Sequence, residues 1–127
     1  MSEANKELSR RFTELFGSDD ETLADQVFGE DVVFHGTSSD GELRGIDAVK
    51  AFVAGFRQAF PDAHSTVEDQ IAEGDKVVTR WRAHGVAGPD RDFAMDGITI
   101  ERITEGRIVE IWVARDEMGL TRELGAV

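Results

Sequence analysis

The hydrophobic positions in the first half of the chain recur at the spacing of α-helices. Apolar residues lie three or four positions apart over residues 8–16, 23–28 and 46–60, with polar residues between them. This is the pattern of amphipathic helices. The third stretch places three phenylalanines on one face and is followed by Pro61, which cannot continue a helix. We therefore expect three helices, the last of which packs against a broad surface such as a sheet.

The second half of the chain has the composition and the turns of an antiparallel sheet. Two glycine-containing turns, at 73–75 and 105–106, each separate two stretches rich in β-branched residues, which predicts two hairpins. Helices followed by such a meander indicate one α+β domain over residues 1–127. Gly97 is the expected position of a bulge or bend in the sheet. The expected strands cover residues 31–35, 65–72, 76–84, 93–104 and 107–115.

The charge balance narrows the range of partners. The chain has 26 acidic against 14 basic residues, a formal net charge of −12. A surface of this kind repels nucleic acids and anionic membranes, so we expect neither as a partner. The acidic residues are spread over the chain, and only three of the 14 basic residues are lysines. This composition suits a halophilic source, although an ordinary acidic protein can share it.

Several classes of site have no support in the sequence. The absence of cysteine excludes disulfides, thiolate nucleophiles and iron–sulfur clusters. The three histidines, His35, His64 and His84, lie far apart and show no metal-ligand spacing, so we expect no metal. The N-terminus is polar, and no apolar run reaches the roughly 18 residues that span a membrane. We expect a cytoplasmic protein.

The strongest candidate for chemistry is Asp116, at the end of the last expected strand. Trp112, Ala114 and Asp116 share one face of a regular strand. If that face looks into a cavity, Asp116 is a carboxylate at the end of an aromatic-walled pocket. Burial raises the pKa of a carboxyl, which suits it as a general base. Alternatively, Asp116 caps the turn that follows the strand.

Three further residues have the character of pocket residues. Trp81 lies on the apolar face of strand 76–84 and is expected in the core or in a pocket wall. Arg102 shares a face with Ile98 and Ile100, so it either reaches into a pocket as an oxyanion partner or extends to solvent at the strand end. His35 ends a short apolar strand, in either a proton-transfer or a structural role.

Seven strings, met in order along the chain, together resemble the SnoaL-like polyketide cyclases, also called ester cyclases, of the nuclear transport factor 2-like superfamily. The likeness covers about residues 5–125. Segment 85–93 is shorter than the hairpin that helps to roof the pocket in many relatives. The matching strings are EDVVFHG (30–36), GELRG (41–45), AFPD (59–62), EGDKVVTRW (73–81), GITIERI (97–103), GRIVEIW (106–112) and GLTRELG (119–125).

The resemblance implies a cone-shaped α+β barrel with a deep apolar pocket, in a homodimer. It also implies an intramolecular aldol ring closure on an apolar carbonyl substrate, without a metal or an organic cofactor. Asp116 would be the general acid and base, while His35 and Arg102 would polarise the carbonyl. The residues expected to line the pocket are Trp81, Phe52, Phe56, Met95 and Trp112.

Two other interpretations stay open. An isomerase or epoxide hydrolase on the same fold would need a second carboxylate facing Asp116, for which Asp96 and Glu101 are the candidates. A non-catalytic dimeric binding protein would instead leave Asp116 paired or exposed and fill the apolar face of the sheet. The apolar residues expected on the outer face of the sheet, where they would suit a dimer, are Val109, Ile111 and Val113.

Overall fold

The part of the chain that the structure describes folds as three helices and six strands. The computed structural model describes residues 2–18, 22–36, 41–86 and 92–116. The helices are α1 (Ser2–Leu15), α2 (Thr22–Val27) and α3 (Ile46–Ala59). The strands are β1 (Phe28–His35), β2 (Glu42–Arg44), β3 (His64–Glu73), β4 (Lys76–Val86), β5 (Asp92–Thr104) and β6 (Arg107–Arg115).

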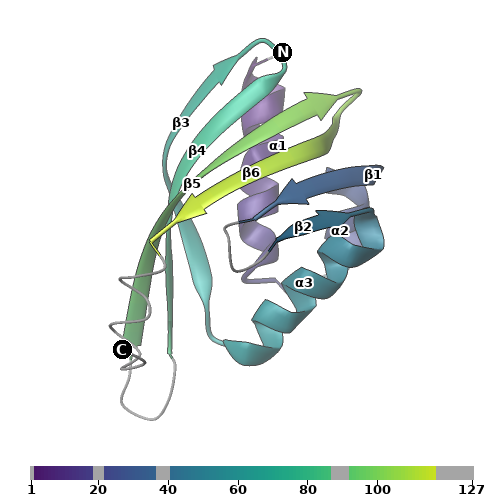
Figure 1. The fold of residues 1–127 in the computed structure, drawn as a ribbon. Helices are drawn as coiled ribbons and strands as arrows, with labels where there is room; N and C mark the ends of the chain where they lie inside the picture. The colour runs from purple at the N-terminus through teal and green to yellow at the C-terminus, as the bar shows by residue number, and fades with distance from the viewer. Residues whose placement is uncertain (1, 19–21, 37–40, 87–91, 117–127) are drawn as a thin grey trace.

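All six strands belong to one sheet with the order β2-β1-β6-β5-β4-β3. Strands β3 to β6 form the expected antiparallel meander, and β1 joins it by running parallel to β6. Figure 1 shows the long strands curving around α1, with α3 beside β1 and β2. The expected α+β class, with helices packed on a bent sheet, is confirmed, although the sheet does not close into a barrel.

The core lies between the helices and the inner face of the sheet. Phe12 of α1 makes edge-to-face contacts with Phe16 and with Phe28 of β1. Burying each such ring stabilises the fold by roughly 1.5–3 kcal/mol. The apolar face expected for strand 76–84 is confirmed, because Val77 and Ala83 are buried on it.

Three features differ from the sequence-based expectation. Strand β1 begins at Phe28, directly after α2, whereas a strand was expected from residue 31. Strand β2 was not expected at all, because its three residues are mostly exposed and show no apolar alternation. Gly97 was the expected position of a bulge or bend, and it is not a bulge: β4 and β5 pair without interruption through Gly97, opposite Trp81.

A bulge does occur on β6, at Val109. Arg102 of β5 pairs with Glu110, but the next residue, Ile103, pairs with Ile108, so Val109 is the extra residue. The bulge resets the alternation, and both Ile108 and Ile111 are fully buried on the inner face. The expectation that Ile111 and Val113 lie on the outer face is therefore wrong, since Val113 also packs against the core.

The orientation of β6 can be checked with two isoleucines on opposite faces of the sheet. We expect Ile111→Ala to lower the free energy of unfolding by about 2–5 kcal/mol, because it leaves a cavity in a closed core. The matched control is Ile98→Ala on the outer face of β5, where the side chain is 46% exposed, and its cost should stay within about 1 kcal/mol. Urea denaturation measures both values, and equal losses would contradict the assigned orientation.

Candidate functional site

A small aromatic cavity lies between α1, α3 and the inner face of the sheet. Its volume is about 50 Å³. That volume holds roughly four water-sized groups. Two helices and five strands contribute to the wall, which explains why residues far apart in the sequence meet there. The lining residues are Phe12, Thr13, Phe16, Phe34, Phe52, Phe56, Ser65, Trp81, Ala83, Met95, Thr99, Val113 and Arg115.

One wall of the cavity depends on a glycine opposite a tryptophan. Trp81 pairs with Gly97 across β4 and β5, and its indole ring lies over the glycine backbone. A Cβ atom on Gly97 would come within 2.2 Å of the ring, so no larger residue fits beside this rotamer. The ring reaches past Gly97, and its Nε1–H donates a hydrogen bond of 2.7 Å to Thr99 Oγ1.

The polar groups of the cavity are few. Thr13 Oγ1 donates to the main-chain oxygen of Ser9, at 3.2 Å, within α1. Thr99 accepts the indole hydrogen bond, and Ser65 contributes a third hydroxyl. Among the lining residues that the structure describes, Arg115 is the only charged one. An apolar wall with a few placed polar groups is typical of a small-molecule site.

Asp116 lies beside this cavity but on the other side of the sheet. Its main-chain N–H extends the β5–β6 ladder by donating to the oxygen of Asp96, at 2.9 Å. Its side chain is exposed and borders an open hollow on the outer face, together with Asp96 and Arg82. Arg115 borders both the hollow and the cavity. Asp116 was expected in the cavity wall; strand alternation instead turns Val113 and Arg115 inward.

His35 and Arg102 are brought together on the outer face by a shared carboxylate. Glu110 accepts hydrogen bonds from His35 Nε2 at 2.7 Å and from Arg102 Nη2 at 3.0 Å. Both bonds lower the pKa of Glu110, and the bond from His35 has the larger effect. The Nδ1 atom of His35 faces Glu42 Oε1 at 3.3 Å, so both ring nitrogens meet a carboxylate.

This outer cluster is separate from the cavity. Trp112 stacks on His35 with ring centroids 5.5 Å apart and does not line the cavity, contrary to expectation. The expected lining by Trp81, Phe52, Phe56 and Met95 does occur. Glu110, which joins His35 to Arg102, lies six residues from Asp116 along β6, or roughly 20 Å at ~3.3 Å per residue. His35 and Arg102 therefore lie too far away to act together with Asp116 on one small carbonyl group.

The most unusual titratable group is Glu101, which is fully buried on the inner face of β5. Ser9 Oγ of α1 donates a hydrogen bond to its Oε1 atom, while Oε2 has no partner among the described residues. Desolvation, only partly opposed by the Ser9 bond, raises the pKa of Glu101 to about 8. The side chain is therefore a neutral acid at pH 7. It was considered only as a possible partner of Asp116, from which the sheet separates it.

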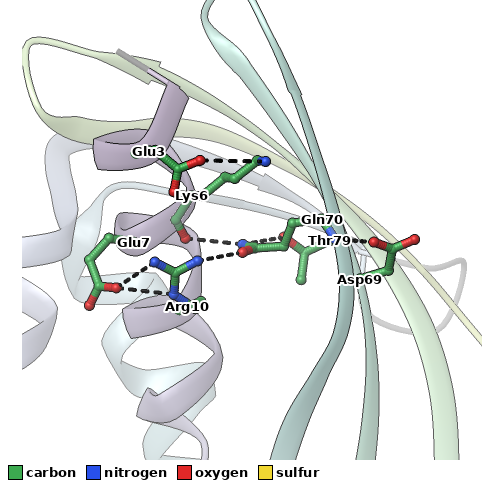
Figure 2. A network of polar contacts seen from close by, with 7 residues as sticks. All are labelled: Glu3, Lys6, Glu7, Arg10, Asp69, Gln70 and Thr79. Atoms are coloured by element: carbon green, nitrogen blue, oxygen red, sulfur yellow. Dashed lines mark hydrogen bonds and ion pairs between the residues drawn. The ribbon is translucent and has the colours of Figure 1, made fainter.

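Hydrogen bonds continue from the Glu101 site to the protein surface. Ser9 Oγ lies 2.6 Å from Thr79 Oγ1, which in turn accepts from Gln70 Nε2 at 3.2 Å. Figure 2 shows Gln70 between Thr79 and Arg10, whose Nη1 donates to Gln70 Oε1 at 2.8 Å. Arg10 is also paired with Glu7 on the exposed side of α1, at 2.7 Å. Polar residues thus tie α1 to β3, β4 and β5.

Comparison with known proteins identifies the family. The profile of the SnoaL-like polyketide cyclases matches residues 6–124. The chain belongs to this family. A candidate polyketide cyclase from Bacillus cereus superposes with a TM-score of 0.87 and 27% identity, over 98% of this chain and 82% of its own. IdmH, a candidate polyketide cyclase from Streptomyces antibioticus, gives 0.87 and 26%, over 95% and 98%. No curated protein matches the chain.

The SnoaL-like fold is also shared by more distant proteins. A protein with a ketosteroid isomerase-like fold from Catenulispora acidiphila superposes with a TM-score of 0.84 at 15% identity, over 94% of this chain and 92% of its own. Within the described residues, His, Asp and Glu side chains form no group of three or more that could hold a metal ion. No helix in that part of the chain has the length and apolar character to cross a membrane.

The Trp81–Gly97 contact predicts the effect of a single methyl group. Gly97→Ala should displace the Trp81 ring and break its bond to Thr99, costing about 1–3 kcal/mol in unfolding free energy. The tryptophan emission should shift at the same time. Gly55→Ala is the control, because the added methyl group meets no atom within 4 Å. Gly55 lies inside helix α3, where alanine is favoured over glycine, so the free energy of unfolding should stay the same or rise. A fully stable Gly97→Ala with unchanged emission would contradict this contact.

The buried acid predicts a pH-dependent stability. Folding raises the pKa of Glu101 from 4.5 to about 8, so the folded state holds the proton more tightly than the unfolded state between these values. The stability of the native protein relative to Glu101→Gln is therefore greatest below pH 4.5. It should fall as pH rises to about 8, by up to about 1.4 kcal/mol per pH unit. Denaturation of both proteins at pH 5, 7 and 9 measures this, and a constant difference would contradict the prediction.

Proposed function

We propose that this protein is a cyclase-type enzyme that closes a ring in an apolar carbonyl compound by cofactor-independent acid and base chemistry. The observation that carries the proposal is the aromatic cavity, which shares Arg115 as a lining residue with the hollow beside Asp116 on the outer face. Membership of the SnoaL-like polyketide cyclases supports the same chemistry. The proposed ligand is neutral or weakly polar, because most of the cavity wall is hydrocarbon.

The volume of the cavity determines how a substrate would bind. About 50 Å³ accepts one end of a polyketide-sized molecule and not the whole of it. The buried end would contact the rings of Phe52, Phe56 and Trp81. The proposal requires the remainder to pass Arg115 at the end of β6 and to reach the outer hollow, where the reacting carbons would lie near Asp116.

In the proposed reaction, Asp116 acts first as a base and then as an acid. Its carboxylate removes a proton from the carbon next to one carbonyl group, which leaves an enolate. The enolate carbon attacks a second carbonyl carbon of the same molecule, so that a carbon–carbon bond forms and that C=O π bond becomes an alkoxide. The alkoxide takes the proton back from Asp116. The product is an isomer of the substrate, and no oxidant or cofactor is consumed. Arg115 would lie beside the developing oxyanion.

His35 and Arg102 have no part in this scheme. Their donors are directed at Glu110, on the outer face and far from Asp116 along β6. We propose that this cluster instead fixes the pairing of β1 with β6, because His35 lies opposite Trp112 in that pair.

The role of Asp116 can be tested by proton exchange at carbon. Protein in D₂O is incubated with enolisable 1,3-diketones, and NMR follows the exchange of α-protons for deuterium. We expect Asp116→Asn to slow the catalysed exchange by about 10²–10⁴-fold, because it removes the base. Asp96→Asn, in the same hollow, is the matched control and should retain most of the activity.

Each other outcome of the exchange experiment supports a rival function. Equal losses in the Asp96 and Asp116 variants would indicate chemistry that uses two carboxylates, as expected for a hydrolase. Binding of diketones without exchange above the protein-free rate would indicate a non-catalytic binding protein. Either result would contradict the cyclase proposal.

A further inference from the structure

Two hydroxyl groups of the cavity, those of Thr13 and Thr99, differ in whether the hydroxyl hydrogen already donates a hydrogen bond within the protein. The hydrogen of Thr13 Oγ1 is donated to the main-chain oxygen of Ser9. Thr99 Oγ1 instead accepts a hydrogen bond from Trp81, and its own hydrogen has no acceptor among the described residues. Thr99 is only 3% exposed, so bulk water does not readily replace the missing acceptor. A buried donor without an acceptor is unfavourable, because it loses its hydrogen bond to water and gains none in return.

The surroundings of Thr99 explain why the protein itself does not supply an acceptor. Across the sheet, Thr99 lies between Thr79 of β4 and Val113 of β6. The Thr79 hydroxyl is engaged with Ser9 and Gln70, and Val113 carries no polar atom in its side chain. Thr99 also lines the cavity, where a bound ligand could supply the acceptor.

The hydrogen bond from Trp81 also makes the Thr99 hydroxyl a stronger donor. The indole N–H cannot accept, so the direction of the 2.7 Å bond is fixed and the Thr99 oxygen is the acceptor. A hydroxyl that accepts one hydrogen bond becomes a stronger donor in a medium of low dielectric constant. Because Gly97 leaves room for the indole, Trp81 holds the Thr99 oxygen at one position in the wall.

We propose that Thr99 determines ligand specificity by donating a hydrogen bond to a carbonyl oxygen at the buried end of the ligand. The cavity then selects neutral ketones and esters, whose alkyl groups lie against Phe52 and Phe56 while the carbonyl oxygen meets Thr99 Oγ1. Trp81 is a positioning residue, since it acts on the ligand through Thr99 as well as by contact. This inference rests on the proposed function for the location of the ligand, but not on the chemistry of Asp116.

The test compares two probes of the same shape, butanone and 2-methyl-1-butene. The carbonyl oxygen of the ketone takes the place of the terminal CH₂ group of the alkene. Each has five non-hydrogen atoms and so suits the cavity volume. Binding is followed by the fluorescence of Trp81 in a Trp112→Phe background, in which Trp81 is the only tryptophan. The measured quantity is the ratio of the ketone affinity to the alkene affinity in each variant, which cancels the different hydration of the two probes.

We expect Thr99→Val to lower that ratio by about 2–10-fold, the effect of one neutral hydrogen bond. Thr99→Ser should restore the ratio, because it keeps the hydroxyl. Thr13→Val is the matched control: it removes a cavity hydroxyl whose hydrogen is already used, so the ratio should stay unchanged even if both affinities move. Stability changes alone cannot reproduce this pattern, since they affect both probes alike.

Three results would overturn the inference. An unchanged ratio in Thr99→Val would show that the hydroxyl does not contact the carbonyl group, and a low ratio in Thr99→Ser would attribute the effect to packing. If neither probe changes the Trp81 fluorescence in any variant, the cavity binds no such ligand. Loss of exchange activity in Asp116→Asn is measured separately, so the catalytic proposal and this one can fail independently.

Discussion

The bulge at Val109 determines which side chains of β6 belong to the interior of this protein. By adding one residue to β6, it allows Ile108 and Ile111 to be buried together, although they are three positions apart in the strand. From that point the alternation is fixed: Val113 and Arg115 face the cavity, whereas Asp116 faces the outer hollow. The cavity lining, the exposure of Asp116 and the isolation of the His35 cluster all follow from this one irregularity.

The interior also shows how polar groups are accommodated opposite an aromatic core. Between α1 and the sheet, Ser9 is hydrogen-bonded both to Glu101 and to Thr79. Because burial keeps the carboxyl neutral at pH 7, the network contains no uncompensated charge. Each hydroxyl in it has a bonding partner, so the network favours one position of α1 on the sheet. The helix position, in turn, sets where Phe12 and Thr13 lie in the cavity wall.

Much of the fold could be predicted from the sequence, because the elements that carry it have clear periodicity. The helix at 46–60 and the hairpin turn at Gly74 have strong local signals, and both occur at the expected places. The face of β6 could not be predicted, since Ile111 and Val113 on one side and Trp112 and Ala114 on the other are all apolar. Hydrophobicity alone cannot say which side is inside, and a single bulge reverses the assignment.

The same ambiguity explains which site residues were found. Four of the five expected cavity residues do line the cavity, and three of them, Phe52, Phe56 and Trp81, lie on elements whose buried face was clear. Thr99 was not expected on the inner face, and Glu101 was considered only as a partner of Asp116, because on β5 the neighbouring Ile98 and Ile100 suggested the opposite face. In the structure those isoleucines lie outside and the polar residues lie inside. Over residues 98–101, β5 thus places isoleucines towards the surface and polar side chains on its inner face. This local arrangement puts Thr99, the hydroxyl proposed to bind the ligand, in the cavity wall.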